Sequence, residues 1–246
     1  MKSSLSKEQS LQEEEYQIPY HWFLRRNTRK GIVYFSYWER AIEVAGDISG
    51  KRLLDAGCGD GFFTALLCEE NPLSVTGIDY SARAVGFAQI LVPQATIKEG
   101  SIEAMPFENE AFDIVFLIET FEHIPLPQRA SILAEISRVL ISGGKMIVTV
   151  PSVLLPTAEK HEEHFTKESL TNILSPYFQQ VSIVGQDKNG ILRDIFWKIF
   201  SLWKNRFWTL HPLVNVWTGV LYRQFFDRAE PQSARRLIGV FRKNSQ

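Results

Sequence analysis

The sequence predicts an α/β fold, a doubly wound and mostly parallel sheet of seven strands. A helical lid precedes this sheet, and a helical insert separates its last two strands. Three observations predict it. From Lys51 onward, apolar strand-like runs alternate with amphipathic helical runs, which is typical of a parallel sheet. The first strand, beginning at Leu53, runs into a glycine-rich turn, and the second ends at an acid, Asp79.

The later elements follow in order along the chain. Further strands are expected at 74–78, 95–98, 112–118, 145–150, 181–184 and 236–242. Helices are expected at 32–45, at 81–91, from Pro127 to a stop at Gly143–Gly144, and from an N-cap at Thr166 to Leu174. The chain then divides into a disordered start and lid (1–47), a core (48–186), an aromatic helical insert (187–233) and a last core strand with its tail (234–246).

Composition narrows the class of protein. The 246 residues can bury a sizeable core, and the net charge of −1 gives no support to a nucleic-acid partner. Two cysteines, Cys58 and Cys68, are too few for a disulfide framework and indicate a reducing compartment. The chain has no basic-then-apolar leader and no run of 18 apolar residues, so we expect a cytoplasmic protein.

The glycine turn leaves two classes of nucleoside ligand open. Gly57, Gly59 and Gly61 lack a Cβ, so the backbone there can pass close to a ligand. A dinucleotide site requires G-x-G-x-x-G, but here the third glycine comes one residue early and Phe62 occupies its position. The sequence pattern D-x-G-C-G-x-G, from Asp55 to Gly61, instead resembles the first motif of class I S-adenosylmethionine-dependent methyltransferases. Asp79, 22 positions after Gly57, suits the ribose of either ligand.

Further motifs strengthen this resemblance, because several motifs in register are more specific than one turn. They are similar to those of the small-molecule, quinone-biosynthesis-like (type 11) branch and lie in the expected order at 100–107, 111–115, 119–124, 139–145 and 164–166. The resemblance covers residues 50 to 185 and implies the Rossmann-like methyltransferase fold, with S-adenosylmethionine as the cofactor.

The resemblance also implies roles for individual residues. Asp55, Gly57 and Gly59, with the small Cys58 in the same turn, would line the methionine end of the cofactor, and Asp79 would bind the ribose hydroxyls. The adenine would be bound by Tyr80, Ser101 and Ile102. Glu119 would lie where the cofactor's sulfonium and the acceptor meet, so it is expected to serve both cofactor binding and catalysis.

Histidines supply the candidate base and candidate substrate contacts. His123 titrates in the useful range and would lie at the mouth of the active site, so it is the first candidate for a general base. His161 and His164 are spaced three apart in a predicted loop, with no third ligand nearby in the sequence, so no metal is expected. These two, together with Tyr20 and His21 of the lid, are expected to face the substrate.

The insert admits two interpretations. Residues 191–204 have helical amphipathicity, and the region holds Trp197, Trp203, Trp208 and Trp217. The segment 191–221 is either a helical hairpin over the active site or an element lying on a membrane surface, which would make the protein membrane-associated. The basic cluster from Arg25 to Lys30 would fit an anionic acceptor such as a phosphorylated or sugar-linked lipid.

Together these features predict a methyltransferase acting on a small-molecule or lipid- or glycan-linked acceptor. Oxygen is the preferred atom, because the chain lacks the asparagine-proline motif of the amine-modifying branch. Two alternatives remain at this stage: a non-catalytic cofactor-binding partner protein and a dinucleotide-dependent oxidoreductase. The sequence does not predict the oligomeric state.

Overall fold

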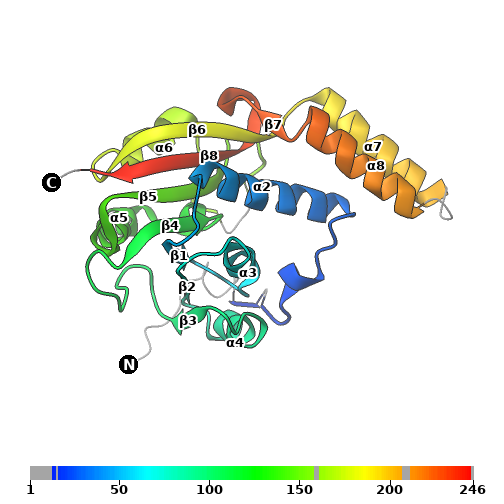
Figure 1. Ribbon diagram of the computed structural model, residues 1–246. Coiled ribbons are helices and arrows are strands. Elements are labelled where there is room, and N and C mark those ends of the chain that lie inside the picture. Colours follow the sequence, from blue (N-terminus) through cyan, green and yellow to red (C-terminus); the bar gives the residue numbers. More distant parts are fainter. Residues whose placement is uncertain (1–12, 15, 158–160, 207–210, 245–246) are drawn as a thin grey trace.

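The computed structural model describes residues 13, 14, 16–157, 161–206 and 211–244. Its centre is one sheet of eight strands in the order β3-β2-β1-β4-β5-β8-β6-β7 (Figure 1). The strands are β1 (Arg52–Ala56), β2 (Ser74–Asp79), β3 (Thr96–Glu99), β4 (Phe112–Ile118), β5 (Leu140–Pro151), β6 (Phe178–Lys188), β7 (Arg228–Ala229) and β8 (Ala234–Lys243).

The connections are mostly helical. The α-helices are α2 (Arg29–Ala45), α3 (Phe62–Cys68), α4 (Ala82–Leu91), α5 (Arg129–Val139), α6 (Lys167–Leu174), α7 (Ile191–Arg206) and α8 (His211–Phe225). Short 3₁₀ helices are η1 (Tyr20–Phe23), η2 (Phe121–His123), η3 (Leu126–Gln128) and η5 (Pro231–Ser233). No helix in the described part of the chain combines the length and apolarity needed to cross a membrane.

The strand directions confirm the predicted doubly wound, mostly parallel sheet. Strands β1 to β5 pair in parallel, whereas β8 lies antiparallel between β5 and β6. The eighth strand is β7, a two-residue strand that pairs with β6 at the sheet edge. The sequence shows no sign of β7 because two residues are too short for a periodic pattern.

Both faces of the sheet are covered, because neighbouring strand residues point to opposite sides. Leu54 belongs to the cluster that α5 and α6 complete, whereas Leu53 belongs to the cluster completed by α2 and α3. Since β4 is buried along nearly its whole length, it forms the centre of the core. The carboxyl end of β4 and those of β1 and β2 lie side by side, along the edge of the sheet that the ends of the parallel strands form.

One predicted boundary is wrong. Gly143–Gly144 does not end a helix, because α5 already stops at Val139 and β5 starts at Leu140. Leu140 pairs with Phe112, and the ladder between β4 and β5 resumes only at Lys145, after a shift in register. The two glycines therefore form an irregularity inside a strand, where Gly143 takes a φ of +71°.

The helices at the two ends of the chain pack together. Helix α2 begins at Arg29, three residues before the predicted start, after an N-cap in which Gly31 N–H donates to the Thr28 side chain. Helices α7 and α8 form a helical hairpin, which extends outward past the beginning of α2 in Figure 1. The two predicted roles of this segment, over the active site or on a membrane surface, stay predictions. At the base of the hairpin, Trp197 and Tyr222 pack against Ile32 of α2.

Candidate active site

The glycine turn after β1 has no room for side chains. Gly57, Gly59 and Gly61 all have positive φ angles, of 82°, 52° and 79°, which other residues rarely adopt. A Cβ on Gly57 would overlap the side chain of Thr120, and one on Gly59 would overlap the hydroxyl of Tyr16. The turn therefore touches both the end of β4 and the N-terminal segment, and these contacts, with the positive φ angles, explain the choice of glycine.

Asp79 joins the turns that follow β1 and β2. Its carboxylate accepts the Gly59 N–H at 2.8 Å through Oδ2 and the Ser81 N–H at 2.9 Å through Oδ1. Burial raises the pKa of Asp79 to about 6 against the lowering effect of these hydrogen bonds. Each carboxylate oxygen can still accept a further hydrogen bond. The arrangement thus fits the diol of a ribose, as predicted.

Asp55 and Cys58 connect the glycine turn to the neighbouring elements of the fold. The Asp55 carboxylate is 1% exposed and accepts a 2.6 Å hydrogen bond from the Thr64 hydroxyl, so it connects β1 to α3. Burial raises the pKa of Asp55 to about 7. Cys58 is buried against Gly77 of β2. A Cβ on Gly77 would come within 2.9 Å of the Cys58 Sγ, so β2 needs a glycine beside this cysteine. Their contacts with the cofactor stay predictions.

The three residues expected around the adenine follow neighbouring strands. Tyr80 is half-buried directly after β2, and Ser101 and Ile102 lie in the loop after β3. The Ser101 hydroxyl accepts the Glu103 N–H at 3.1 Å, and Ile102 packs on the main core cluster. Because β2 and β3 are paired, the structure brings these residues to the same edge as Asp79. Their roles toward adenine stay predictions.

Glu119 has a cationic partner that the sequence did not reveal. Its backbone, at a φ of +48°, closes β4, and its Oε2 accepts a 2.9 Å hydrogen bond from Nε of Arg236 on β8. The Arg236 guanidinium also lies over the Tyr37 ring, 4.8 Å from its centroid. Burial alone would lower the pKa of Arg236, but Glu119 together with the tyrosines Tyr37 and Tyr34 outweighs burial and raises it. Both predicted roles of Glu119, catalytic and cofactor-binding, stay predictions.

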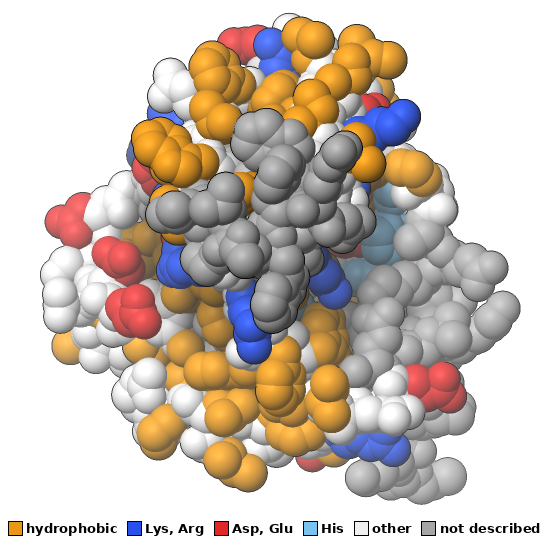
Figure 2. All heavy atoms as spheres, turned by 90° about the vertical axis from the view of Figure 1, so that its right-hand side faces the viewer, with side chains coloured by type: hydrophobic (Ala, Val, Ile, Leu, Met, Phe, Trp, Pro, Cys, Tyr) orange, Lys and Arg blue, Asp and Glu red, His pale blue; other side chains and the backbone are white. Residues whose placement is uncertain are grey.

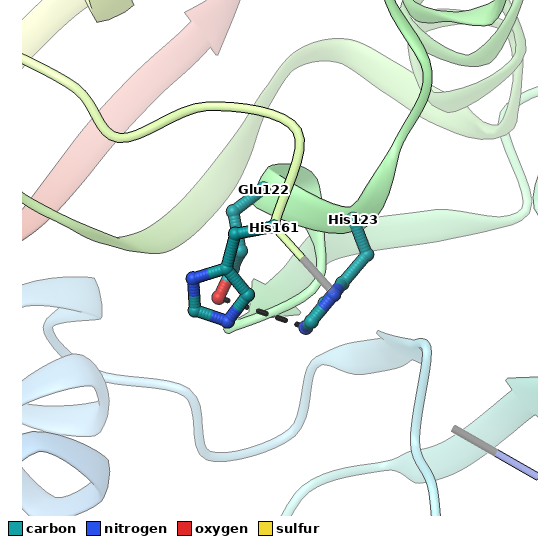
Figure 3. Close-up of side chains that lie close together, drawn as sticks. All are labelled: Glu122, His123 and His161. Carbon is teal, nitrogen blue, oxygen red and sulfur yellow. Dashed lines mark ion pairs between the residues drawn. The ribbon is translucent and has the colours of Figure 1, made fainter. Parts of the chain in front are cut away.

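His123 lies in a histidine cluster. It belongs to η2, and its ring meets the His161 ring edge to face at 4.8 Å (Figure 3). His161 Nδ1 and His164 Nε2 are 2.7 Å apart, and His164 Nδ1 lies 3.1 Å from the Leu155 carbonyl oxygen. The structure therefore brings together the predicted base and two of the predicted substrate contacts.

The same cluster contains an acid, Glu122. In Figure 3 its carboxylate points toward both imidazoles, and Oε1 lies 4.0 Å from His123 Nε2. Glu122, His123 and His161 each offer one potential metal-ligand atom, and these atoms lie within 4.8 Å of one another. No metal was expected because the sequence shows no third ligand near His161 and His164. The fold brings two further potential ligands, Glu122 and His123, close to His161. The absence of a metal stays a prediction.

The lid residues Tyr20 and His21 lie at the glycine turn, and their contacts with a substrate stay predictions. The His21 N–H and its Nδ1 each lie 3.0 Å from a carboxylate oxygen of Asp60, and the Trp22 indole donates to the Asp60 carbonyl at 2.9 Å. Tyr20 stacks on Tyr16, with ring centroids 5.5 Å apart. Sequence reasoning missed Asp60 and Tyr16 as parts of the site. The D in G-D-G was the available signal for Asp60.

A cavity of about 250 Å³ opens beside Glu119 and the histidine cluster. Arg236, which binds Glu119, is in its wall, and so is Leu155, whose carbonyl oxygen meets His164. The other lining residues come from α2, β6, α7 and β8: Arg29, Lys30, Val33, Tyr34, Asp187, Arg193 and Arg235. The cavity therefore adjoins both the partner of Glu119 and the carbonyl oxygen that meets the histidine cluster.

Comparison with known proteins gives a consistent result. Residues 54–148 match a family model described as a methyltransferase domain, Methyltransf_11. A probable S-adenosylmethionine-dependent methyltransferase of Mycolicibacterium smegmatis is 30% identical over 130 residues, 51% of this chain and 49% of that protein. A ubiquinone biosynthesis O-methyltransferase of Paracidovorax citrulli is 33% identical over 109 residues, 42% and 44% of the two chains. This chain thus spans about half the length of the curated relatives that it matches.

A solved structure extends the fold comparison to nearly the whole chain. The N-methyltransferase NodS from Bradyrhizobium japonicum, in complex with S-adenosyl-L-homocysteine, superposes with a TM-score of 0.66 over 98% of this chain and 100% of that one. At 16% identity this likeness shows the fold alone. Together with the match of residues 54–148 to the family model, it confirms the predicted family for this part of the chain: the chain contains a class I S-adenosylmethionine-dependent methyltransferase domain of the Methyltransf_11 type.

Proposed function

We propose that this protein transfers a methyl group from S-adenosylmethionine to an oxygen atom of a small-molecule or lipid- or glycan-linked acceptor. The observation that carries the proposal is the meeting of three strand ends at one edge of the sheet. The glycine turn ends β1, Asp79 ends β2, and Glu119 with His123 follows β4. The first two suit a nucleoside cofactor, and the third supplies groups that act on an acceptor.

The residues present fit the cofactor. The open backbone of the turn would hold the methionine end, and Asp79 would accept hydrogen bonds from the ribose. When bound, S-adenosylmethionine supplies a methyl group on a cationic sulfur, which reacts by in-line displacement. The task of the protein is therefore mainly to align the acceptor with this methyl group. Glu119 is held in position for that task by Arg236.

An oxygen acceptor needs a base if its hydroxyl is protonated at working pH. His123 is suited to this because its side chain is only 14% exposed yet belongs to a chain of imidazoles, through His161 to His164. A proton taken up by His123 is stabilised by the nearby carboxylate of Glu122. The name of the Paracidovorax relative, an O-methyltransferase, also supports oxygen.

The direct test incubates the protein with methyl-labelled S-adenosylmethionine and a total cell extract, which is then partitioned into organic and aqueous phases. Label in the organic phase would support a lipid-linked acceptor, and label in the aqueous phase a soluble metabolite or glycan. Alkaline hydrolysis and mass analysis of the labelled product then identify the methylated atom. No label in either phase, despite cofactor binding, would favour the non-catalytic alternative.

A further inference from the structure

The cavity beside Glu119 has an excess of positive charge. Its lining contains one acid, Asp187, and the basic residues Arg29, Lys30, Arg193, Arg235 and Arg236. Two of these cations are neutralised by close carboxylates. Arg193 forms a two-pronged pair with Asp187, with both distances 2.6 Å, and Arg236 pairs with Glu119 at 2.9 Å.

Among the described residues, the other three cations have no carboxylate of their own. The Arg29 guanidinium lies 5.2 Å from the centroid of the Trp197 ring, and the Lys30 ammonium lies 5.4 Å from that of Tyr34. Arg235 comes within 3.5 Å of Asp187, which Arg193 already occupies. Burial and the neighbouring Arg193 lower the pKa of Arg235, as expected where cations crowd together. An anion in this cavity would relieve that repulsion.

The cavity is also placed to hold one end of the acceptor. Arg236 connects its wall to Glu119, and the carbonyl oxygen of Leu155 connects it to the histidine cluster. A molecule whose anionic group binds the cavity would therefore extend toward the edge where Glu119 and His123 lie. The anion-binding residues would orient the acceptor without taking part in the methyl transfer.

The hairpin of α7 and α8, which forms one side of the cavity, is apolar on its outer face. More than half of the large hydrophobic side chains exposed in the described residues belong to it: Ile191, Leu192, Ile195, Ile199, Leu202, Val216, Trp217, Val220, Leu221 and Phe225. Its inner face is apolar too, through Trp197, Phe200 and Tyr222. An exposed apolar area of this extent marks an interaction surface, so this outer face calls for a partner.

We propose that the acceptor is a lipid with an anionic, phosphate-type head group, which the cavity binds while the hairpin lies on the lipid surface. This inference rests on the proposed methyltransferase function. The first turn of α7 carries both features, since Ile191 and Leu192 are exposed while Arg193 lines the cavity. In Figure 2, which faces the hairpin end of the molecule, basic side chains lie between two areas of hydrophobic ones.

Charge favours a lipid over a second copy of this chain. An isologous dimer through the hairpins would bring two cavities with the same excess of cations toward each other. An anionic lipid surface instead complements these cations and offers an apolar layer to the hairpin. The occupant that satisfies both the charge and the apolar face is therefore a lipid with an anionic head group.

The first test is flotation of the full chain with vesicles of phosphatidylcholine, with and without phosphatidic acid. We expect the wild-type protein to float with the phosphatidic acid vesicles, and Ile195→Ser combined with Ile199→Ser to reduce the bound fraction at least fivefold. Ile90→Ser is the matched control, because Ile90 is exposed on α4, away from the hairpin. Wild-type protein that stays at the bottom of the gradient would overturn the lipid assignment. So would a wild-type protein that elutes as a dimer in size-exclusion chromatography when the hairpin variant elutes as a monomer.

The second test separates the head group from a free anion. Combining Arg29→Gln, Lys30→Gln and Arg235→Gln should weaken binding to phosphatidic acid vesicles about tenfold, whereas Lys167→Gln, an exposed change on α6, should not. Inorganic pyrophosphate, titrated by calorimetry, reports on free anions. If pyrophosphate binds the wild-type protein tightly and the wild-type protein does not bind phosphatidic acid vesicles, the ligand is a soluble anion and the lipid is excluded.

Calorimetry with S-adenosylmethionine on the same preparations distinguishes this inference from the function it rests on. Variants that lose vesicle binding should keep wild-type affinity for S-adenosylmethionine, which also shows that they are folded. A wild-type protein that binds vesicles but not S-adenosylmethionine would refute the proposed function. One that binds S-adenosylmethionine but neither vesicles nor pyrophosphate would refute the inference alone.

Discussion

The two sides of the active site are built in opposite ways. On the cofactor side, backbone groups and buried acids from short segments, around Gly57–Gly61 and Asp79–Ser81, are joined by hydrogen bonds. On the acceptor side, the cavity is lined by basic and aromatic side chains from α2, α7 and β8, which lie far apart in the chain. The first side depends on local chain geometry, and the second on how distant elements pack.

This difference matches the demands of the two ligands. A cofactor that a whole family shares can be bound by a fixed backbone turn. The acceptor differs between family members, so side chains, which can vary, must bind it. The charges differ as well. Asp55 and Asp79 make the cofactor side acidic, while Arg235 and Arg236 make the acceptor side basic. Glu119, paired with Arg236, lies at the boundary between them.

The difference between the two sides is tested most directly by substituting His123, on the acceptor side. His123→Ala should lower turnover by about 10²- to 10⁴-fold, because a positioned base contributes that much to proton transfer. The rate is measured with the acceptor fraction that takes up label. Affinity for S-adenosylmethionine should stay within about twofold, since His123 lies outside the glycine turn. Unchanged turnover would remove the catalytic role from His123.

A second test concerns what fixes the hairpin to the core. Arg193→Leu should lower the free energy of unfolding by about 3–5 kcal/mol, because it leaves the carboxylate of Asp187, which is 1% exposed, without its closest cation and, among the described residues, with only Arg235 at 3.5 Å. Urea unfolding measures the change. The matched control is Arg223→Leu, which breaks an exposed pair with Glu39 and should cost less than about 1 kcal/mol. Equal costs would mean that Asp187 and Arg193 do not fix the hairpin.

The cofactor side is tested by Asp79→Asn. This change keeps the shape but replaces one acceptor oxygen by an amide group, which faces the N–H of either Gly59 or Ser81. We expect affinity for S-adenosylmethionine to fall about 10- to 100-fold, or about 1.4–2.7 kcal/mol. Asp113→Asn is the control, because Asp113 also accepts a backbone N–H, from Arg52, but at the opposite edge of the sheet. If both variants bind equally well, Asp79 does not contact the cofactor.

The smallest expected effect is a dependence on pH. Burial raises the pKa of Asp79 from its ordinary value of 3.8 to about 6, so the folded protein holds a proton that the unfolded chain has lost. The stability contributed by this group is therefore fully present below about pH 4 and is lost as pH rises through about 6.

Affinity for S-adenosylmethionine should change in the opposite direction. Only the ionised carboxylate of Asp79 accepts hydrogen bonds with both oxygens, so binding should be about tenfold weaker at pH 5 than at pH 7. Calorimetry at several pH values measures this profile. The Asp79→Asn variant should lose it, and a profile that survives the substitution would assign the titration to another group, such as Asp55.

The sequence predicted the cofactor side well because its signals are local. The turn from Asp55 to Gly61, the acid at Asp79 and the N-cap at Thr166 each require particular residues within a few positions. The mostly parallel sheet followed from the alternation of strands and helices. What was missed, namely β7 and the glycines inside β5, depends on pairing with distant strands rather than on periodicity.

The acceptor side was only partly predictable for the same reason. His123, His161 and His164 were identified as candidates one by one, but their meeting with Glu122 requires the loop after β5 to fold back on η2. The pairing of Glu119 with Arg236 depends on β8 lying antiparallel beside β5. Nothing in the local sequence around either residue specifies such contacts.

Titration of the full chain with S-adenosylmethionine and, separately, with NAD in a calorimeter tests the central claim most directly. The account predicts one site per chain for S-adenosylmethionine, weakened by Asp79→Asn and unaffected by Asp113→Asn, and no heat of binding with NAD. Binding of NAD, or binding of S-adenosylmethionine that Asp79→Asn leaves unchanged, would contradict the assignment of this edge of the sheet to the cofactor.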